Sequence, residues 1–181
     1  MTEASKILLA HHLKTLKLPT FLRAYVKVAR QCAVEGLDHV KFLTRLVDME
    51  LIERERRIKA AKFPATKSLY SFEFKAIPKL NMMQVLELAR CKWIDWRENV
   101  IALGPSETGK THLAVGLGLA ACQKGMSVAF TTAAALLNEM MEARDERSLL
   151  RLQKQLAAVK LFIIDELGFV PLSKTGCPGN R

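Results

Sequence analysis

The sequence predicts an α/β fold in which a parallel sheet follows an all-helical N-terminal module. Apolar residues recur at helical spacing through residues 3–62, which indicates successive amphipathic helices. From Asn99 onward, short apolar runs alternate with longer helical stretches. That alternation is typical of a parallel sheet covered by helices on both faces. The composition, 50% apolar and 25% charged, is that of a globular protein.

Three helices are expected in the N-terminal module, residues 1–63. The first stops before Pro19, the second ends near Gly36, and the third begins near Asp38, a residue type that caps helix N-termini. The third helix is expected to continue through the charged run 53–59, which we interpret as a solvated face, with contact to a partner as the alternative. Two i,i+4 ion pairs are expected in this run, Glu53–Arg57 and Glu55–Lys59.

Residues 64–97 are expected to form a linker with one short helix, residues 82–93. The first part of the linker, residues 64–80, interleaves aromatic side chains with lysines. Such aromatics can stack on nucleic-acid bases, but we favour their role as anchors that hold the linker on a neighbouring core. The aromatic residues at this junction are Phe63, Tyr70, Phe72 and Phe74.

Residues 98–174 are expected to form a partial sheet domain, and residues 175–181 a separate tail. The expected strands are 100–103, 126–131 and 161–164. The expected helices are 111–124, which ends at Gly125, 133–143, which Thr132 caps, and 149–160. Each strand is short and apolar, so we expect it to be buried between layers of helices.

The net charge of +10 is distributed unevenly along the chain. Residues 1–97 hold 19 Lys and Arg against 10 Asp and Glu, whereas residues 98–181 hold 9 against 8. The first half is therefore a candidate for contact with an anionic polymer such as nucleic acid, and a solvated basic surface is the equal alternative. A further basic cluster, Arg144, Arg147 and Arg151, is interpreted as an exposed helix face, with DNA contact as the less favoured alternative.

The sequence argues against a membrane or secreted protein. The longest nearly unbroken apolar run is Leu113–Cys122, whereas a helix needs roughly 20 apolar residues to span a bilayer. The N-terminus does not have the pattern of a secretory signal. Four scattered cysteines, Cys32, Cys91, Cys122 and Cys177, are interpreted as reduced thiols of a cytoplasmic protein.

The loop Gly104–Thr111 carries the most specific motif, a full match to G-x-x-x-x-G-K-[ST] between an apolar run and a helix. Backbone N–H groups of such a loop and of the helix that follows bind phosphate oxygens. Lys110 is expected to reach the β- and γ-phosphates of ATP, and Thr111 to ligate Mg²⁺. The candidate nucleotide-binding residues are Gly104, Pro105, Ser106, Glu107, Thr108, Gly109, Lys110, Thr111 and His112. For His112, a packed or exposed helix position is the preferred interpretation.

A second motif, Asp165–Glu166, follows the apolar run 161–164. An aspartate at the end of a buried strand beside the loop is where a P-loop NTPase holds its magnesium, so Thr111 and Asp165 are the candidate metal ligands. Glu166 is placed to orient or deprotonate the attacking water, which makes Glu166 and Lys110 the candidate catalytic residues.

Several segments together resemble the IstB-like ATP-binding proteins. These segments are 61–64, 104–112, 130–136, 142–147, 163–168 and 171–173. The family consists of helper proteins of transposition in bacterial insertion sequences, of the AAA+ class and related to the DnaC helicase loader. The resemblance covers nearly the whole chain, from about Leu8 to Lys174.

The resemblance implies an AAA+-type sheet with strand order 5-1-4-3-2, of which this chain carries the first three strands. The sheet is therefore expected to be incomplete at the C-terminus, and strand 100–103 to lack the neighbour that would join it to strand 161–164. The resemblance also implies an N-terminal module that contacts DNA, and an ATPase domain that forms a homo-oligomer on DNA. That assembly would direct a partner transposase to its target.

Two departures from the family pattern bear on activity. Glu107 stands where the family has glycine, so a left-handed backbone there costs about 1–2 kcal/mol. Its carboxylate adds roughly 2–3 kcal/mol of repulsion at about 6 Å from a phosphate, and less if the side chain turns to solvent. The tail 175–181 departs from the family and is interpreted as a frameshifted or truncated reading frame, so hydrolysis is expected to be weak or absent. The alternatives are a non-catalytic DNA- or partner-binding fragment and a DnaC-like helicase loader.

Overall fold

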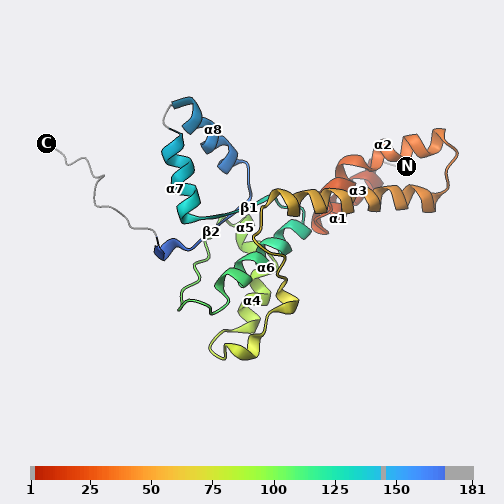
Figure 1. The fold of residues 1–181 in the computed structure, drawn as a ribbon. Helices are drawn as coiled ribbons and strands as arrows, with labels where there is room; N and C mark the ends of the chain where they lie inside the picture. The colour runs from red at the N-terminus through yellow and green to blue at the C-terminus, as the bar shows by residue number, and fades with distance from the viewer. Residues whose placement is uncertain (1–2, 144–145, 170–181) are drawn as a thin grey trace.

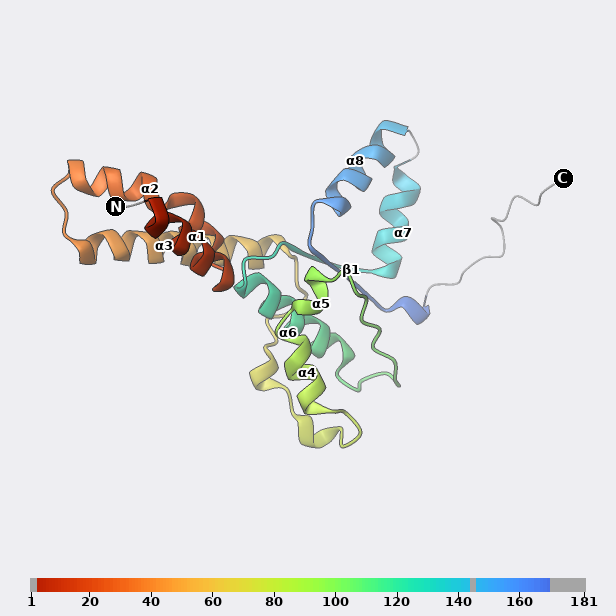
Figure 2. The same cartoon turned by 180° about the vertical axis from the view of Figure 1, so that it is seen from behind.

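The computed structural model describes residues 3–143 and 146–169, and three parts are visible in Figures 1 and 2. A helical arm of α1 (Glu3–Thr15), α2 (Pro19–Val34) and α3 (His39–Ala60) extends to one side. The body holds η1 (Leu69–Ser71), η2 (Phe74–Ala76), α4 (Met82–Leu88), α5 (Lys92–Asp95), α6 (Lys110–Gln123), β1 (Val128–Thr132), β2 (Leu161–Asp165) and η3 (Leu167–Phe169). A V-shaped hairpin of α7 (Ala133–Glu142) and α8 (Glu146–Ala157) projects from the strands.

The three helices of the arm begin and end where local sequence predicts. Pro19 opens α2, and the Asp38 side chain caps α3 by accepting a hydrogen bond of 2.8 Å from the Lys41 N–H. The helices α2 and α3 bury a small core of their own, Ala24, Val28, Cys32 and Leu46. Because α3 runs from this core into the body, it is the element that joins the two parts.

The charged end of α3 departs from the predicted pairing. Arg57 does not pair with Glu53 but with Glu50, at 2.9 Å, and the two side chains are only 13% and 12% exposed. Arg57 also donates to the Cys122 carbonyl at 3.2 Å, one of the last carbonyls of α6. Glu53 pairs instead with Arg56, whose hydrogen bond lowers the pKa of Glu53.

The i,i+4 prediction was wrong for Glu53–Arg57 because the interface with α6 draws Arg57 inward. The predicted pair Glu55–Lys59 is also not formed within the described chain. The run 53–59 therefore has one face on the body and is not simply a solvated surface.

Two of the three predicted strands form, and they lie side by side in parallel, with Val128 opposite Leu161 and Thr132 opposite Asp165. The third, residues 100–103, lies outside the sheet, with Ile101 79% and Leu103 89% exposed. The prediction of a three-stranded sheet was therefore wrong for the described residues, where the sheet has two strands. A strand needs a neighbour to pair its backbone groups, and in the described part of the chain none lies beside residues 100–103.

The core of the body joins the end of α3 to α5, α6 and both strands. Its buried members include Ala61, Cys91, Ala121, Cys122 and Val128. A Cβ added at Gly118 of α6 would lie 2.7 Å from Phe63 and 2.9 Å from Ile163, so the absence of a side chain there lets α6 approach β2 closely. Burial raises the pKa of Cys122 to about 11, so its thiol stays protonated at neutral pH.

Two helix ends in the body lie where the sequence predicts them, whereas one predicted helix is divided. The predicted helix 82–93 is divided into α4 and α5, because Cys91 takes a left-handed backbone with φ of 60°. Gly125 follows the end of α6 and Thr132 caps α7, as predicted. No helix in the described ranges is long and apolar enough to cross a membrane. Arg144, the segment 171–173, Cys177 and the tail 175–181 lie outside the described residues.

Candidate functional site

The loop before α6 is closed by its own hydrogen bonds. The Thr108 hydroxyl donates to the Pro105 carbonyl at 2.8 Å, and the Lys110 ammonium donates to the same oxygen. Gly109 takes a left-handed conformation with φ of 78°, which only glycine adopts without cost, and α6 begins at the next residue. The first backbone N–H groups of α6 have no side-chain cap, so they remain available to an anion at this end of the helix.

A side-chain hydrogen bond joins the end of β2 to the start of α6. The Thr111 hydroxyl donates to Asp165 Oδ2 at 2.7 Å, across 54 positions of the sequence. The other carboxylate oxygen of Asp165 accepts the Glu166 N–H at 3.0 Å. Glu166 has a left-handed backbone with φ of 59° and an exposed side chain. The two residues predicted to hold magnesium, Thr111 and Asp165, are thus in direct contact, and Glu166 lies next to Asp165.

The oxygen donors of Thr111 and Asp165 suit Mg²⁺, a hard cation that prefers oxygen ligands. Nucleotide sites usually hold this ion with one or two protein oxygens, while phosphates and waters complete its coordination. A hydroxyl and a carboxylate in direct contact, next to a loop with the phosphate-binding pattern, therefore fit a magnesium–nucleotide complex.

Glu107 lies at the tip of the loop with a left-handed φ of 63°, the conformation that glycine would adopt without strain. Its side chain is exposed, so water screens its charge and weakens the repulsion expected against a phosphate. The backbone cost of about 1–2 kcal/mol remains.

His112 lies in the first turn of α6 but faces the linker. Its Nε2 atom is 2.9 Å from the Ser68 carbonyl and 3.3 Å from the Ser71 hydroxyl. Its ring stands edge-on to Phe72, with ring centroids 5.1 Å apart. This geometry agrees with the preferred interpretation of a packed helix histidine, and a contact with nucleotide stays a prediction.

The linker supports the loop in a way that the sequence did not reveal. Phe72 is 8% exposed, and its ring would lie 2.8 Å from a Cβ added at Gly109. About two turns further along α6, Leu69 would lie 2.6 Å from a Cβ added at Gly116. The linker thus runs along α6 as far as the phosphate-binding loop. The interleaved aromatics predicted anchoring, but nothing in the sequence identified Gly109 as the anchor point.

The predicted anchoring role is confirmed for Phe63 and Phe72. Phe63 packs on α6 and stands edge-on to Phe130 of β1, with ring centroids 6.3 Å apart. Tyr70 is fully exposed, so base stacking remains open at that position.

Comparison with known proteins identifies relatives over nearly the whole chain. The family model for IstB-like ATP binding protein matches residues 11–178. A protein of insertion sequence IS5376 from Geobacillus stearothermophilus, named for ATP binding, is 32% identical over 87% of this chain and 64% of its own length. Its counterpart in IS21 from Pseudomonas aeruginosa is 34% identical over 90% of this chain and 63% of its own length. The corresponding protein of IS232 from Bacillus thuringiensis subsp. berliner is 32% identical over 91% of this chain and 68% of its own length. The chain therefore spans about two thirds of the length of these relatives.

Proposed function

The chain belongs to the IstB-like ATP-binding family, and we propose that it binds ATP with Mg²⁺ at the loop Gly104–Thr111 and the carboxylate of Asp165. The observation that carries this proposal is the 2.7 Å hydrogen bond between Thr111 and Asp165, which joins the two motifs of a P-loop site. The names of the relatives, which refer to ATP binding, support it.

Each residue of the site has a role that follows from its chemistry. The loop and the first N–H groups of α6 would hold the phosphates. Lys110 would exchange the Pro105 carbonyl for a phosphate oxygen and so add a positive charge. Thr111 and Asp165 would hold Mg²⁺, which neutralises phosphate charge when bound. Glu166 would orient a water and accept its proton, a role that its exposed position at the strand end permits.

The proposal extends to a DNA-associated helper ATPase of transposition in the cytoplasm, one that acts with a transposase and assembles as several copies on target DNA. The relatives' names place them in insertion sequences, which supports a role in transposition. The basic arm supports DNA contact. Some of its cations are paired with acids, but others form no ion pair within the described chain: Lys14, Lys27, Arg30, Lys41, Arg54 and Lys59.

Binding of a fluorescent ATP analogue in the presence of Mg²⁺ tests the nucleotide site. We expect Lys110→Ala to weaken binding by 10²-fold or more, because it removes the cation that reaches the phosphates. Lys75→Ala, at an exposed linker position, is the matched control and should leave the affinity unchanged. An unaltered affinity in Lys110→Ala would refute the assignment. Glu166→Gln should keep ATP binding and abolish whatever DNA-stimulated hydrolysis the chain shows.

A second candidate function is DNA or partner binding without use of ATP. It is favoured by the exposed residues 100–103, which leave the loop without a strand before it, and by the strained Glu107. Such a protein would bind duplex DNA in a salt-dependent way, and neither ATP nor Lys110→Ala would alter that affinity. An ATP-dependent change in DNA affinity would exclude this candidate.

A further inference from the structure

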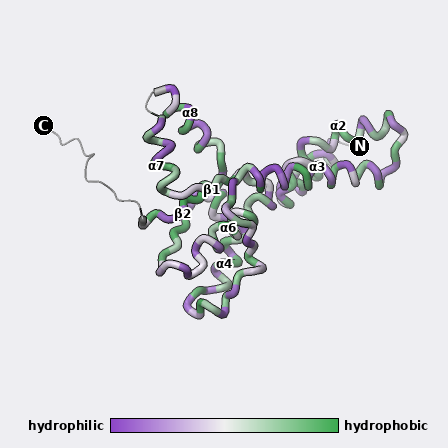
Figure 3. The backbone as a smooth tube through the Cα atoms, viewed as in Figure 1, coloured by the Kyte–Doolittle hydropathy of each residue, from purple (hydrophilic) through white to green (hydrophobic). Residues whose placement is uncertain are grey.

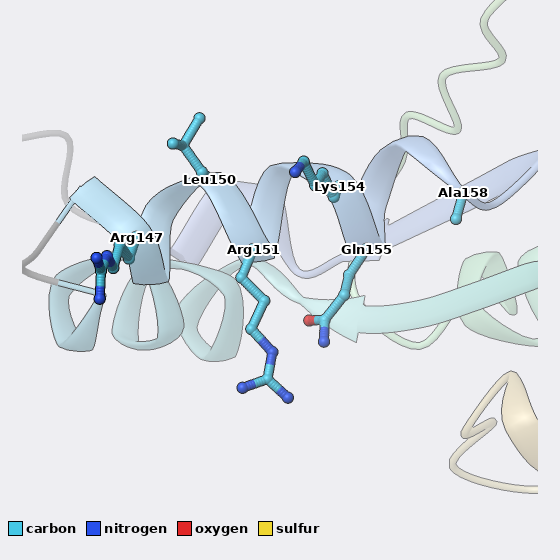
Figure 4. Close-up of a pocket in the computed structure, with 6 residues that line it drawn as sticks. All are labelled: Arg147, Leu150, Arg151, Lys154, Gln155 and Ala158. Carbon is cyan, nitrogen blue, oxygen red and sulfur yellow. The ribbon is translucent and has the colours of Figure 1, made fainter.

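The helix α8 carries a row of cations on one face. Arg147, Arg151 and Lys154 follow one another at spacings of four and three residues, which places them on the same side of the helix. All three side chains are exposed. Together with Leu150, Gln155 and Ala158 they line a shallow groove along α8, shown in Figure 4. We call these three cations the basic face of α8.

The cations of this face are not paired with any acid whose side chain the structure describes. None of the three cations forms an ion pair within the described chain, whereas Arg23, Arg45 and Arg56 of the arm all do. The charge count along the sequence hides this difference, because residues 98–181 are close to neutral in sum. Asp165 and Glu166 at the nucleotide site form no ion pair with these cations.

We infer that the basic face of α8 binds the phosphodiester backbone of duplex DNA, an inference that rests on the DNA association proposed above. The cations span about 10 Å at a rise of 1.5 Å per residue, and duplex DNA carries one negative charge per about 1.7 Å of its axis, so several phosphates lie within reach. The planar guanidinium groups of Arg147 and Arg151 suit two-point contact with phosphate oxygens.

The residues that line the groove indicate a duplex rather than a single strand. Proteins that hold single strands combine cations with aromatic side chains on which bases stack. The lining holds an aliphatic side chain, Leu150, and an amide, Gln155, and no aromatic. Contacts of this kind position a backbone without reading or stacking bases.

The test measures duplex binding by the full chain across a salt series, by fluorescence anisotropy. In the variant Arg147→Gln/Arg151→Gln/Lys154→Gln we expect affinity to fall by about 10²-fold near 0.1 M salt, with a plot of log K against log salt shallower by about 2–3. The variant Arg147→Lys/Arg151→Lys keeps the charge and should keep the slope. The control Lys67→Gln/Lys75→Gln/Lys79→Gln removes as many exposed charges from the linker and should change the slope by less than 1.

The inference is overturned if the α8 variant and the linker control lose the same affinity, or if the α8 variant keeps the wild-type slope. Tighter binding of the wild-type chain to a single strand, or to anionic vesicles, than to duplex DNA would also overturn it. Failure of the proposed function looks different, because the wild-type chain would then bind no duplex at any salt concentration. Thermal melts by circular dichroism confirm that each variant is folded, and the fluorescent nucleotide confirms that the ATP site is unchanged.

Discussion

Two apolar runs of this chain, residues 100–103 and 161–164, have nearly the same local character and different structures. Each is a run of four apolar residues placed directly before a motif with chemical function. The second forms β2, whereas the first is exposed and stays outside the sheet, although it is just as hydrophobic (Figure 3). An apolar run is therefore compatible with a strand, but the strand forms only where a neighbouring strand pairs its backbone groups.

The two runs differ in what surrounds them. Along its length β2 pairs with β1, and Ile163 packs against α6 where Gly118 leaves room. Ile101 and Leu103 make no comparable contact and are mostly in solvent. The loop between Gly104 and Thr111 therefore draws its support from α6 and from Phe72 of the linker, not from the run before it.

The largest effect is expected at Phe72, because it takes the place of a strand in holding the loop. Phe72→Ala should lower the free energy of unfolding by about 3 kcal/mol, since a nearly buried ring over Gly109 is lost. Tyr70→Ala, at a fully exposed ring in the same linker, should change it by less than about 0.5 kcal/mol. Urea unfolding followed by circular dichroism measures both. Equal effects would show that the linker does not support the loop.

A smaller difference in the free energy of unfolding is expected between substitutions in residues 161–164 and in residues 100–103. Ile163→Ala is expected to lower the free energy of unfolding by about 2 kcal/mol, because a side chain that packs against Gly118 is removed. Ile101→Ala should cost less than about 0.5 kcal/mol, since Ile101 is largely exposed. The same urea experiment compares the pair. A loss of 1 kcal/mol or more in Ile101→Ala would mean that residues 100–103 are buried in solution.

The smallest effect is expected at Glu107, in the loop that follows the unpaired run. Glu107→Gly should raise the free energy of unfolding by about 0.5–1 kcal/mol, because left-handed strain is relieved and only part of the gain is offset by the freer unfolded chain. Glu107→Gln keeps the strain and should leave stability unchanged. Both variants remove the carboxylate, so both should bind the ATP analogue a few-fold more tightly. A gain in stability in Glu107→Gln would show that charge, not backbone strain, is the cost.

Features set by neighbours in sequence could be predicted well. Pro19, Asp38, Gly125 and Thr132 mark helix ends because each acts through its own backbone or a group three or four residues away. The loop Gly104–Thr111 was found in the same way, since phosphate binding needs a fixed local pattern.

Features set by distant neighbours could not be predicted. Arg57 had a partner at the preferred helical spacing, but the carbonyl of Cys122 and the carboxylate of Glu50 drew it into the interface between α3 and α6. The sequence predicted that Phe72 anchors the linker, but only the fold shows that its ring packs against Gly109. In both cases a contact with a residue far along the sequence, Cys122 for Arg57 and Gly109 for Phe72, fixes the position of the side chain.

Residue types at short spacing were enough to identify the family, the phosphate-binding loop and the acidic pair Asp165–Glu166. The three-dimensional fold was needed to show that Thr111 contacts Asp165, that residues 100–103 lie outside the sheet, and that Arg147, Arg151 and Lys154 line one face of α8. The physical reason is that pairing and burial depend on what lies next to a residue in space, and the order of residues along the chain does not specify that neighbour.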